Sequence, residues 1–250
     1  MAFALALVKL DEVLKEPGCP VCRMSRRMAG RAMDVFLWEN INVPEVRQPI
    51  IDAYGLCPEH TRLLAATEIS TSGQVLGVNI IYSHLARVTA EELRKLDRGP
   101  GVTSVLVWFK SLFRPGEKHT ILPPQRECPV CEQVRQDDLN SLATLFEELD
   151  HSAPSILESY QTSDGLCLPH LRLGLERYAA KYPKAAKMLT EDAATRLERY
   201  REGMLEYIRK SNWEYRSEAM TAEESNAWRQ ALTFFTGYPG AKFTFHLEDL

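Results

Sequence analysis

The sequence predicts an all-α protein made of two related helical halves. Apolar residues recur at helical spacing through most of the chain, which is typical of helices with one buried face. Prolines, glycines and capping residues stand where those segments would begin and end. One short pattern of cysteine and histidine occurs twice, which indicates an internal repeat. Alternation typical of a strand is found only in the tail, at Phe243, Phe245 and Leu247.

The first half is expected to contain five helices. A short one, with Leu7, Leu10 and Leu14 on one face, should end at Pro17 and Gly18. A second should follow Cys22. The remaining three are expected over 45–54, from 61 onward, and over 75–96.

The second half shows the same density of helical signals. Helices are expected over 134–149, 154–160 and 171–178. Pro183 suits the first turn of the next helix, and Thr190 is expected to cap the long segment that ends near Arg209. Thr221 and Glu224 form the capping-box pattern, which should open a last helix reaching 235.

These elements predict four parts of the chain. Residues 1–97 form an N-terminal repeat and residues 128–236 a C-terminal repeat. Between them lies a linker, 98–127, marked by glycine and proline at both ends. Its apolar residues over 102–113 predict an amphipathic helix. Residues 237–250 form a tail.

Composition excludes several classes of protein. The chain has 250 residues, 45% of them hydrophobic, and a formal net charge of −4, so binding to nucleic acid is not expected. No apolar stretch approaches the roughly 20 residues that span a bilayer, which predicts that there is no transmembrane segment. The N-terminus lacks the basic residues and cleavage site of a signal peptide. We therefore expect a cytoplasmic protein.

The repeated pattern uses every cysteine in the chain. The tetrapeptide CPVC occurs at Cys19–Cys22 and again at Cys128–Cys131. GLCPEH follows the first copy and GLCLPH the second, and the gaps are 34 residues from Cys22 to Cys57 and 35 residues from Cys131 to Cys167. These two hexapeptides supply the remaining four residues of the pattern, Cys57, His60, Cys167 and His170. A duplicated CxxC and CxxH that leaves no cysteine over is a specific signal for metal binding.

Three thiolates and one imidazole are a complete tetrahedral set for Zn²⁺. A helix N-terminus also favours thiolates, because its partial positive charge lowers the pKa of a cysteine. The similar gaps suggest two short helices that go out and return, so each half should close its own site. We therefore expect one zinc ion at each of two sets of ligands: Cys19, Cys22, Cys57 and His60, and Cys128, Cys131, Cys167 and His170.

Three other uses of these cysteines stay open. Disulfides would require an oxidising compartment and would leave both histidines without a role. Catalytic dithiol chemistry uses a similar CPxC turn, but that turn follows a core strand, whereas LKEPG and PPQRE precede these pairs. An iron–sulfur cluster with three cysteines and one histidine is chemically reasonable.

The chain resembles an uncharacterised bacterial family, common in Chloroflexus-like bacteria. CPVC…GLCPEH, RECPVC…GLCLPH and NWEYRSEAMTAEESNAWRQALTFFTG carry the resemblance, which covers most of the chain. It implies a helical, metal-binding cytosolic protein with the eight cysteine and histidine ligands named above, and it implies no activity. The C-terminal segment departs slightly from the family pattern, because Trp213 and Glu214 precede Tyr215.

These observations predict a helical scaffold or adaptor with two structural zinc sites and an unidentified protein partner. The alternative is an iron–sulfur redox or sensor protein that uses the same residues. No sequence motif for catalysis is present, which favours a protein without enzymatic activity. The third alternative is an enzyme whose site lies between the two halves and is built from residues without a recognisable motif. The sequence does not determine the oligomeric state.

Two complete ligand sets predict two metal ions per chain. Elemental analysis of freshly purified protein should therefore give about two zinc ions for each polypeptide. A value of one would mean that only one set binds an ion, and the absence of metal would contradict the metal-binding interpretation.

Overall fold

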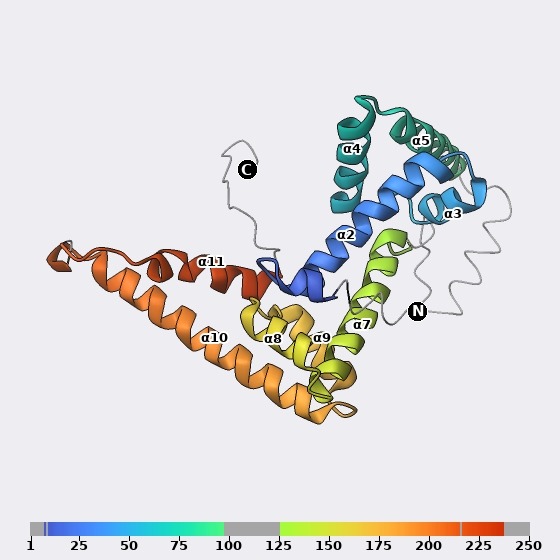
Figure 1. The fold of residues 1–250 in the computed structure, drawn as a ribbon. Coiled ribbons are helices and arrows are strands. Elements are labelled where there is room, and N and C mark those ends of the chain that lie inside the picture. Colours follow the sequence, from blue (N-terminus) through green and yellow to red (C-terminus); the bar gives the residue numbers. More distant parts are fainter. Residues whose placement is uncertain (1–7, 9, 98–125, 216, 238–250) are drawn as a thin grey trace, which may run out of the picture. The chain divides into compact units, whose positions relative to one another are not determined.

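The protein is all-α in the computed structural model, which describes residues 8, 10–97, 126–215 and 217–237. No strand occurs among these residues, so the predicted fold class is confirmed. In the first half of the chain, residues 10–14 are α-helical, and α2 (Pro20–Val35), α3 (Pro44–Asp52), α4 (Pro58–Ser72) and α5 (Leu76–Asp97) follow. Those in the second half are α7 (Pro129–Asp150), α8 (Pro154–Thr162), α9 (Leu168–Tyr178), α10 (Pro183–Lys210) and α11 (Ala222–Thr236) (Figure 1). A π-helix, η1 (Phe36–Asn40), extends α2, and a short 3-10 helix, η2 (Trp213–Tyr215), follows α10.

The chain forms two compact units. Unit 1 comprises residues 1–28 and 134–250, and unit 2 comprises 29–133. Both unit boundaries fall inside helices, α2 and α7, whereas the predicted repeats end at 97 and begin at 128. The amphipathic helix predicted over 102–113 and the strand-like tail lie outside the described residues.

Most helices begin where the sequence predicts. Proline occupies the first turn of α3, α4, α8, α9 and α10, where its missing N–H leaves no helical hydrogen bond unmade. Thr221 and Glu224 form the predicted capping box, in which each side chain accepts a hydrogen bond from the other residue's backbone N–H. The cap predicted at Thr190 is wrong, because α10 runs without a break from Pro183. The Thr190 hydroxyl donates to the Ala186 carbonyl inside that helix instead.

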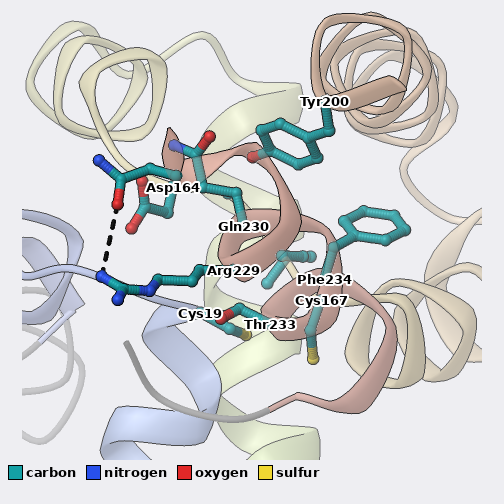
Figure 2. Close-up of a pocket in the computed structure, with 11 residues that line it drawn as sticks. Cys19, Asp164, Cys167, Tyr200, Arg229, Gln230, Thr233 and Phe234 are labelled. Carbon is teal, nitrogen blue, oxygen red and sulfur yellow. Dashed lines mark hydrogen bonds between the residues drawn. The ribbon is translucent and has the colours of Figure 1, made fainter. Parts of the chain in front are cut away.

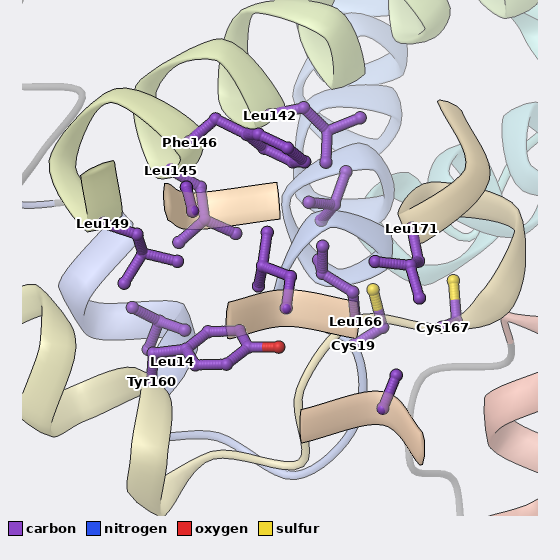
Figure 3. Packing of buried hydrophobic residues seen from close by; sticks show 14 of the residues in the cluster. Leu14, Cys19, Leu142, Leu145, Phe146, Leu149, Tyr160, Leu166, Cys167 and Leu171 are labelled. Carbon is purple, nitrogen blue, oxygen red and sulfur yellow. The ribbon is translucent and has the colours of Figure 1, made fainter. Parts of the chain in front are cut away.

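The core of unit 1 lies where α7, α8, α9 and α10 pack together. Leu142, Leu145 and Phe146 from α7 are completely buried there (Figure 3). Leu10 and Leu14 of the N-terminal segment, together with Cys19 and Cys167, belong to the same cluster. Two of the predicted metal ligands therefore lie in the hydrophobic core of this unit.

The helices α10 and α11 pack against each other more extensively than any other pair (Figure 1). A Cβ atom on Gly203 of α10 would lie 2.8 Å from Cβ of Ala227, so the two backbones approach closely at this point. Lys210 and Glu224 form an ion pair of 2.8 Å, with side chains 9% and 13% exposed. These contacts fix α11, which borders one of the candidate metal sites.

The core of unit 2 is smaller. Among the described residues it consists of Met33, Phe36, Ile50, Leu56, Leu64, Ile81 and Cys128. Glu68, a buried acid on α4, accepts hydrogen bonds from the backbone N–H groups of Gly77 and Val78 at 2.5 and 3.0 Å. Backbone N–H groups in the first turn of a helix have no partner within that helix. Glu68 therefore caps the N-terminus of α5 by accepting hydrogen bonds from two of them. Across the described parts of both units, no helix has the length and apolar character needed to cross a membrane.

A glycine in α9 is required by the packing of unit 1. A Cβ atom on Gly174 would lie 2.5 Å from Cε2 of Phe146, whose ring is completely buried and cannot move aside. Gly174→Ala should therefore destabilise the protein by about 1–3 kcal/mol, measured by thermal or denaturant unfolding.

Gly30→Ala is the matched control for that change. Gly30 also lies inside a helix, α2, but no atom lies within 4 Å of the position its Cβ would take. This variant should be neutral or up to about 1 kcal/mol more stable. Equal effects of the two substitutions would contradict the packing described for Phe146.

Candidate metal centres

The four cysteine motifs adopt one local structure. In each, the first ligand directly precedes a helix and the second lies in its first turn, because α2, α4, α7 and α9 begin at Pro20, Pro58, Pro129 and Leu168. The carbonyl groups of the four leading cysteines accept the first helical hydrogen bonds, from Arg23, Thr61, Glu132 and Leu171, at 2.8–3.1 Å. Because two ligands three residues apart lie on one side of a helical turn, each motif presents a pair of ligand atoms in one direction.

The first candidate site belongs to unit 1 and is formed by Cys19, Cys22, Cys167 and His170. Nδ1 of His170 lies 3.6, 3.3 and 3.2 Å from the sulfur atoms of Cys19, Cys22 and Cys167. The sulfur atoms of Cys22 and Cys167 are 3.7 Å apart. The N-termini of α2 and α9 therefore meet at one point.

The second candidate site belongs to unit 2 and is formed by Cys57, His60, Cys128 and Cys131. Nδ1 of His60 lies 3.2, 3.7 and 3.3 Å from the sulfur atoms of Cys57, Cys128 and Cys131. The sulfur atoms of Cys57 and Cys131 are 3.6 Å apart. Here the N-termini of α4 and α7 meet in the same way.

The prediction that each half closes its own site is wrong. The structure groups all eight predicted residues, but the CPVC of each half meets the CxxH of the other half. Helix lengths give the reason. From the first CPVC the chain runs about 24 Å along α2, and from the second about 33 Å along α7. The helices that follow them, α3 and α8, have nine residues each, or about 14 Å, and are too short to return to the starting cysteines.

The ligand spacing fits a single tetrahedral ion. Ligand atoms at about 2.0–2.3 Å from a central zinc ion lie about 3.5–3.8 Å from one another. The four distances given above for each site, 3.2–3.7 Å, are close to these values, and all four ligand atoms of each site lie within 4.8 Å of one another. All six cysteines are free, and sulfur atoms 3.6–3.7 Å apart are not joined by a disulfide bond. Three thiols and one imidazole per site therefore remain available to hold a metal.

The crowded thiols influence one another's ionisation. Burial acts to raise the pKa of Cys19, but hydrogen bonds with Cys167, Cys22 and His170 lower it well below its usual range. The pKa of Cys22 is raised by hydrogen bonds with Cys167 and Cys19. At the second site, burial and the neighbouring Cys57 and Cys128 raise the pKa of Cys131 to about 12. One thiolate thus opposes ionisation of the next, and a cation that binds all three removes this repulsion.

Sequence reasoning missed three residues of the first site. Asp138 lies on α7, and its carboxylate is 3.3 Å from Nε2 of His170, the nitrogen that faces away from the sulfur atoms. The Ser25 hydroxyl donates a hydrogen bond to the other oxygen of the same carboxylate. Burial acts to lower the pKa of His170, but Asp138 and the adjacent cysteines raise it to about 12. No motif marks Asp138, because its role depends on the fold bringing α7 beside α9.

Gly237 is the third missed residue. It ends α11 in the left-handed conformation, with φ of 75°. A Cβ atom at this position would lie 3.3 Å from the sulfur atoms of both Cys22 and Cys167. The backbone at the end of α11 therefore covers the first site closely.

A cavity of about 260 Å³ adjoins the first site. Cys19 and Cys167 form part of its wall together with Gly165, Leu166 and Phe234, and its polar lining comes from Asp164, Tyr200, Asn226, Arg229, Gln230 and Thr233 (Figure 2). Tyr200 is only 3% exposed, and its hydroxyl points toward the cavity. Arg229 donates a long hydrogen bond of 3.5 Å to Asn226. The cavity can admit water or a small polar molecule beside the cysteines.

The closeness of Gly237 to the sulfur atoms gives a direct test of the first site. Gly237→Ala would place a methyl group against Cys22 and Cys167 and would also strain the left-handed backbone by about 1 kcal/mol. We expect a chelator to remove metal from the first site at least several-fold faster, measured by the absorbance of the metal–chelator complex.

Gly73→Ala is the control that separates the effect of backbone strain from the effect of contact with the sulfur atoms. Gly73 ends α4 with φ of 67°, and no atom lies within 4 Å of the position of its Cβ. This variant carries the same backbone cost but should leave release from the first site unchanged. Equal release from both variants would contradict the placement of Gly237.

A known protein is similar to this chain over most of its length. The chain is 26% identical over 235 residues to the "Uncharacterized 23.9 kDa protein in xynA 3'region" of Caldicellulosiruptor sp. (strain Rt8B.4), covering 90% of this chain and 98% of that protein. No solved structure matches this chain. Residues 1–241 match a family of unknown function, DUF6062, and the chain belongs to that family.

Proposed function

We propose that the protein is a helical scaffold in which one structural zinc ion holds each unit, and that it acts by binding another protein. The observation that carries the first part is the meeting of three cysteines and one histidine, twice, at the spacing of a tetrahedral ion. Cys19, Cys22, Cys167 and His170 would hold one ion, and Cys57, His60, Cys128 and Cys131 the other.

Four protein ligands support a structural role. A catalytic zinc ion usually keeps one position for water or substrate, whereas these sets fill all four. The ion would supply positive charge that stabilises three adjacent thiolates and would join two helix N-termini. Binding energy then becomes folding energy.

The separation of the ligand atoms favours one ion over an iron–sulfur cluster. The four ligand atoms of each site lie within 4.8 Å of one another. A cluster places several iron and sulfide atoms between its ligands and so needs them further apart. An iron–sulfur sensor with the same residues is the second candidate, and its visible absorption distinguishes it from colourless zinc protein.

The free cysteines support a cytoplasmic location, and the exposed apolar side chains support a protein partner. Six free cysteines suit a reducing compartment, which supports a cytoplasmic location. Several large apolar side chains are exposed at the C-terminal end of α10 and in η2: Leu205, Tyr207, Ile208 and Trp213. Such clusters occur at protein interaction sites, and the net charge of −4 gives no attraction to nucleic acid.

Substitution of one ligand in each site tests the structural role. Cys22→Ser and Cys131→Ser should each reduce the zinc content by about one ion per chain and lower the melting temperature by several degrees. The measurements are elemental analysis and thermal unfolding followed by circular dichroism.

His151→Gln is the control, because His151 is exposed and belongs to neither site. It should keep two ions and the parent melting temperature. Ligand variants that remain as stable as the parent would refute the structural-zinc proposal, and a brown parent protein absorbing near 400 nm would favour the cluster.

A further inference from the structure

The two candidate sites have the same ligands but different surroundings. In the first, Nε2 of His170 is hydrogen-bonded to Asp138, and both side chains are only 14% exposed. The Ser25 hydroxyl donates to the other carboxylate oxygen, and the Val21 carbonyl oxygen lies 2.7 Å from the same hydroxyl oxygen, so the two acceptors share its one proton. A carboxylate behind a ligating histidine fixes the orientation of the ring and makes the nitrogen that faces the metal more basic.

The second site lacks this support. Among the described residues, no group forms a hydrogen bond with Nε2 of His60. A comparison of equivalent positions in the two repeats gives the reason. Asp138 follows Cys131 by seven positions in α7, and the residue seven positions after Cys22 in α2 is Ala29, whose methyl group accepts no hydrogen bond. The matching position of the other copy therefore cannot supply a carboxylate.

The sulfur atoms are also less protected at the second site. Cys19 and Cys167 of the first site are each 2% exposed, and the end of α11 at Gly237 lies against Cys22 and Cys167. Cys22 is the one partly exposed cysteine of the first site, whereas at the second site both Cys57 and Cys131 are partly exposed and Cys128 is buried at 8% exposure. Although a cavity borders Cys19 and Cys167, the second site exposes more of its cysteines, so a competing chelator reaches its thiolates more easily.

The units differ in how much core would remain without metal. Unit 1 has a large hydrophobic cluster built from α7, α8, α9, α10 and α11. Within the described residues of unit 2, the cluster contains seven buried side chains, and one of them is the ligand Cys128. Because a small core supplies little stability, the described part of unit 2 would depend more strongly on its ion.

We propose that the first site keeps its metal while the second site exchanges it, so that occupancy of the second site decides whether the described part of unit 2, residues 29–97 and 126–133, stays folded. This inference rests on the proposed function, since it requires that both sites bind zinc. Under this proposal, unit 2 of the scaffold responds to metal, whereas unit 1 keeps its ion and stays folded. Asp138 acts as a positioning residue, because it touches His170 and not the metal.

Chelator-induced release of zinc from the full-length protein tests the order. With excess 4-(2-pyridylazo)resorcinol, release should occur in two phases of one ion each, separated by at least about tenfold in rate. Cys131→Ser should remove the fast phase and Cys22→Ser the slow phase. A single phase, or the opposite assignment of the phases, overturns the inference. Protein that never binds zinc refutes the proposed function itself, which is a different result.

Hydrogen–deuterium exchange during the same reaction tests the coupling to folding. After the fast phase, amides in 29–94 and 126–133 should lose protection, while those in 134–215 and 217–236 retain it. Simultaneous loss of protection in both units, or no change in unit 2, overturns the proposed switch.

Variants at Asp138 test the cause. Asp138→Asn should accelerate the slow phase about 10- to 100-fold and leave the fast phase unchanged. Glu176→Gln, which changes an exposed acid on α9, should alter neither phase. The Nε2–H signal of His170 in nuclear magnetic resonance provides a second readout: it should be visible in the parent, weakened in Asp138→Asn and lost in Asp138→Ala. An unchanged slow phase in Asp138→Asn overturns the role of the carboxylate.

Discussion

Both units depend on the meeting of two helix N-termini at one point. Such ends carry partial positive charge and unpaired N–H groups, so they do not attract each other. Three thiolates and an imidazole would reverse this, because anionic sulfur atoms interact favourably with both helix ends and can converge on one cation. The same four residues would therefore compensate the helix termini and form the proposed metal centre. Removal of the cation would leave like charges together in a buried place.

The lengths of the helices determine which termini can meet. The long helices α2 and α7 begin at cysteine pairs and carry the chain away from them, and the nine-residue helices α3 and α8 cannot return it. Each CPVC is completed by a CxxH more than a hundred residues away at the first site and about seventy at the second. These contacts join segments distant in sequence, so each unit would acquire its proposed ion only after much of the chain is in place.

The sequence predicted what depends on local chemistry and failed where long-range geometry decides. Helical spacing, proline at helix starts and the Thr221–Glu224 capping box identified the helices, and the cysteine spacing identified all eight grouped residues. The predicted pairing of CPVC with the CxxH of the same half was wrong. Gaps of similar length do not show how the residues between the two motifs are divided between long and short helices. Asp138 and Gly237 carry no local signal, since only the packing of α7 and α11 brings them to the first site.

Because the pairing is crossed, each candidate metal site combines the CPVC of one repeat with the CxxH of the other. A repeat and a metal site are therefore different sets of residues. Helix α7 begins with two cysteines of the second site, yet two turns later it supplies the carboxylate that orients His170 in the first. A substitution along α7 can therefore alter one site without changing the ligands of either. Identical ligands can then acquire unequal affinity through the residues behind them, because the basicity and orientation of a ligating histidine depend on its hydrogen-bond partner. The difference between Asp138 and Ala29 at matching positions is the physical basis on which two sites with the same ligands can serve different purposes.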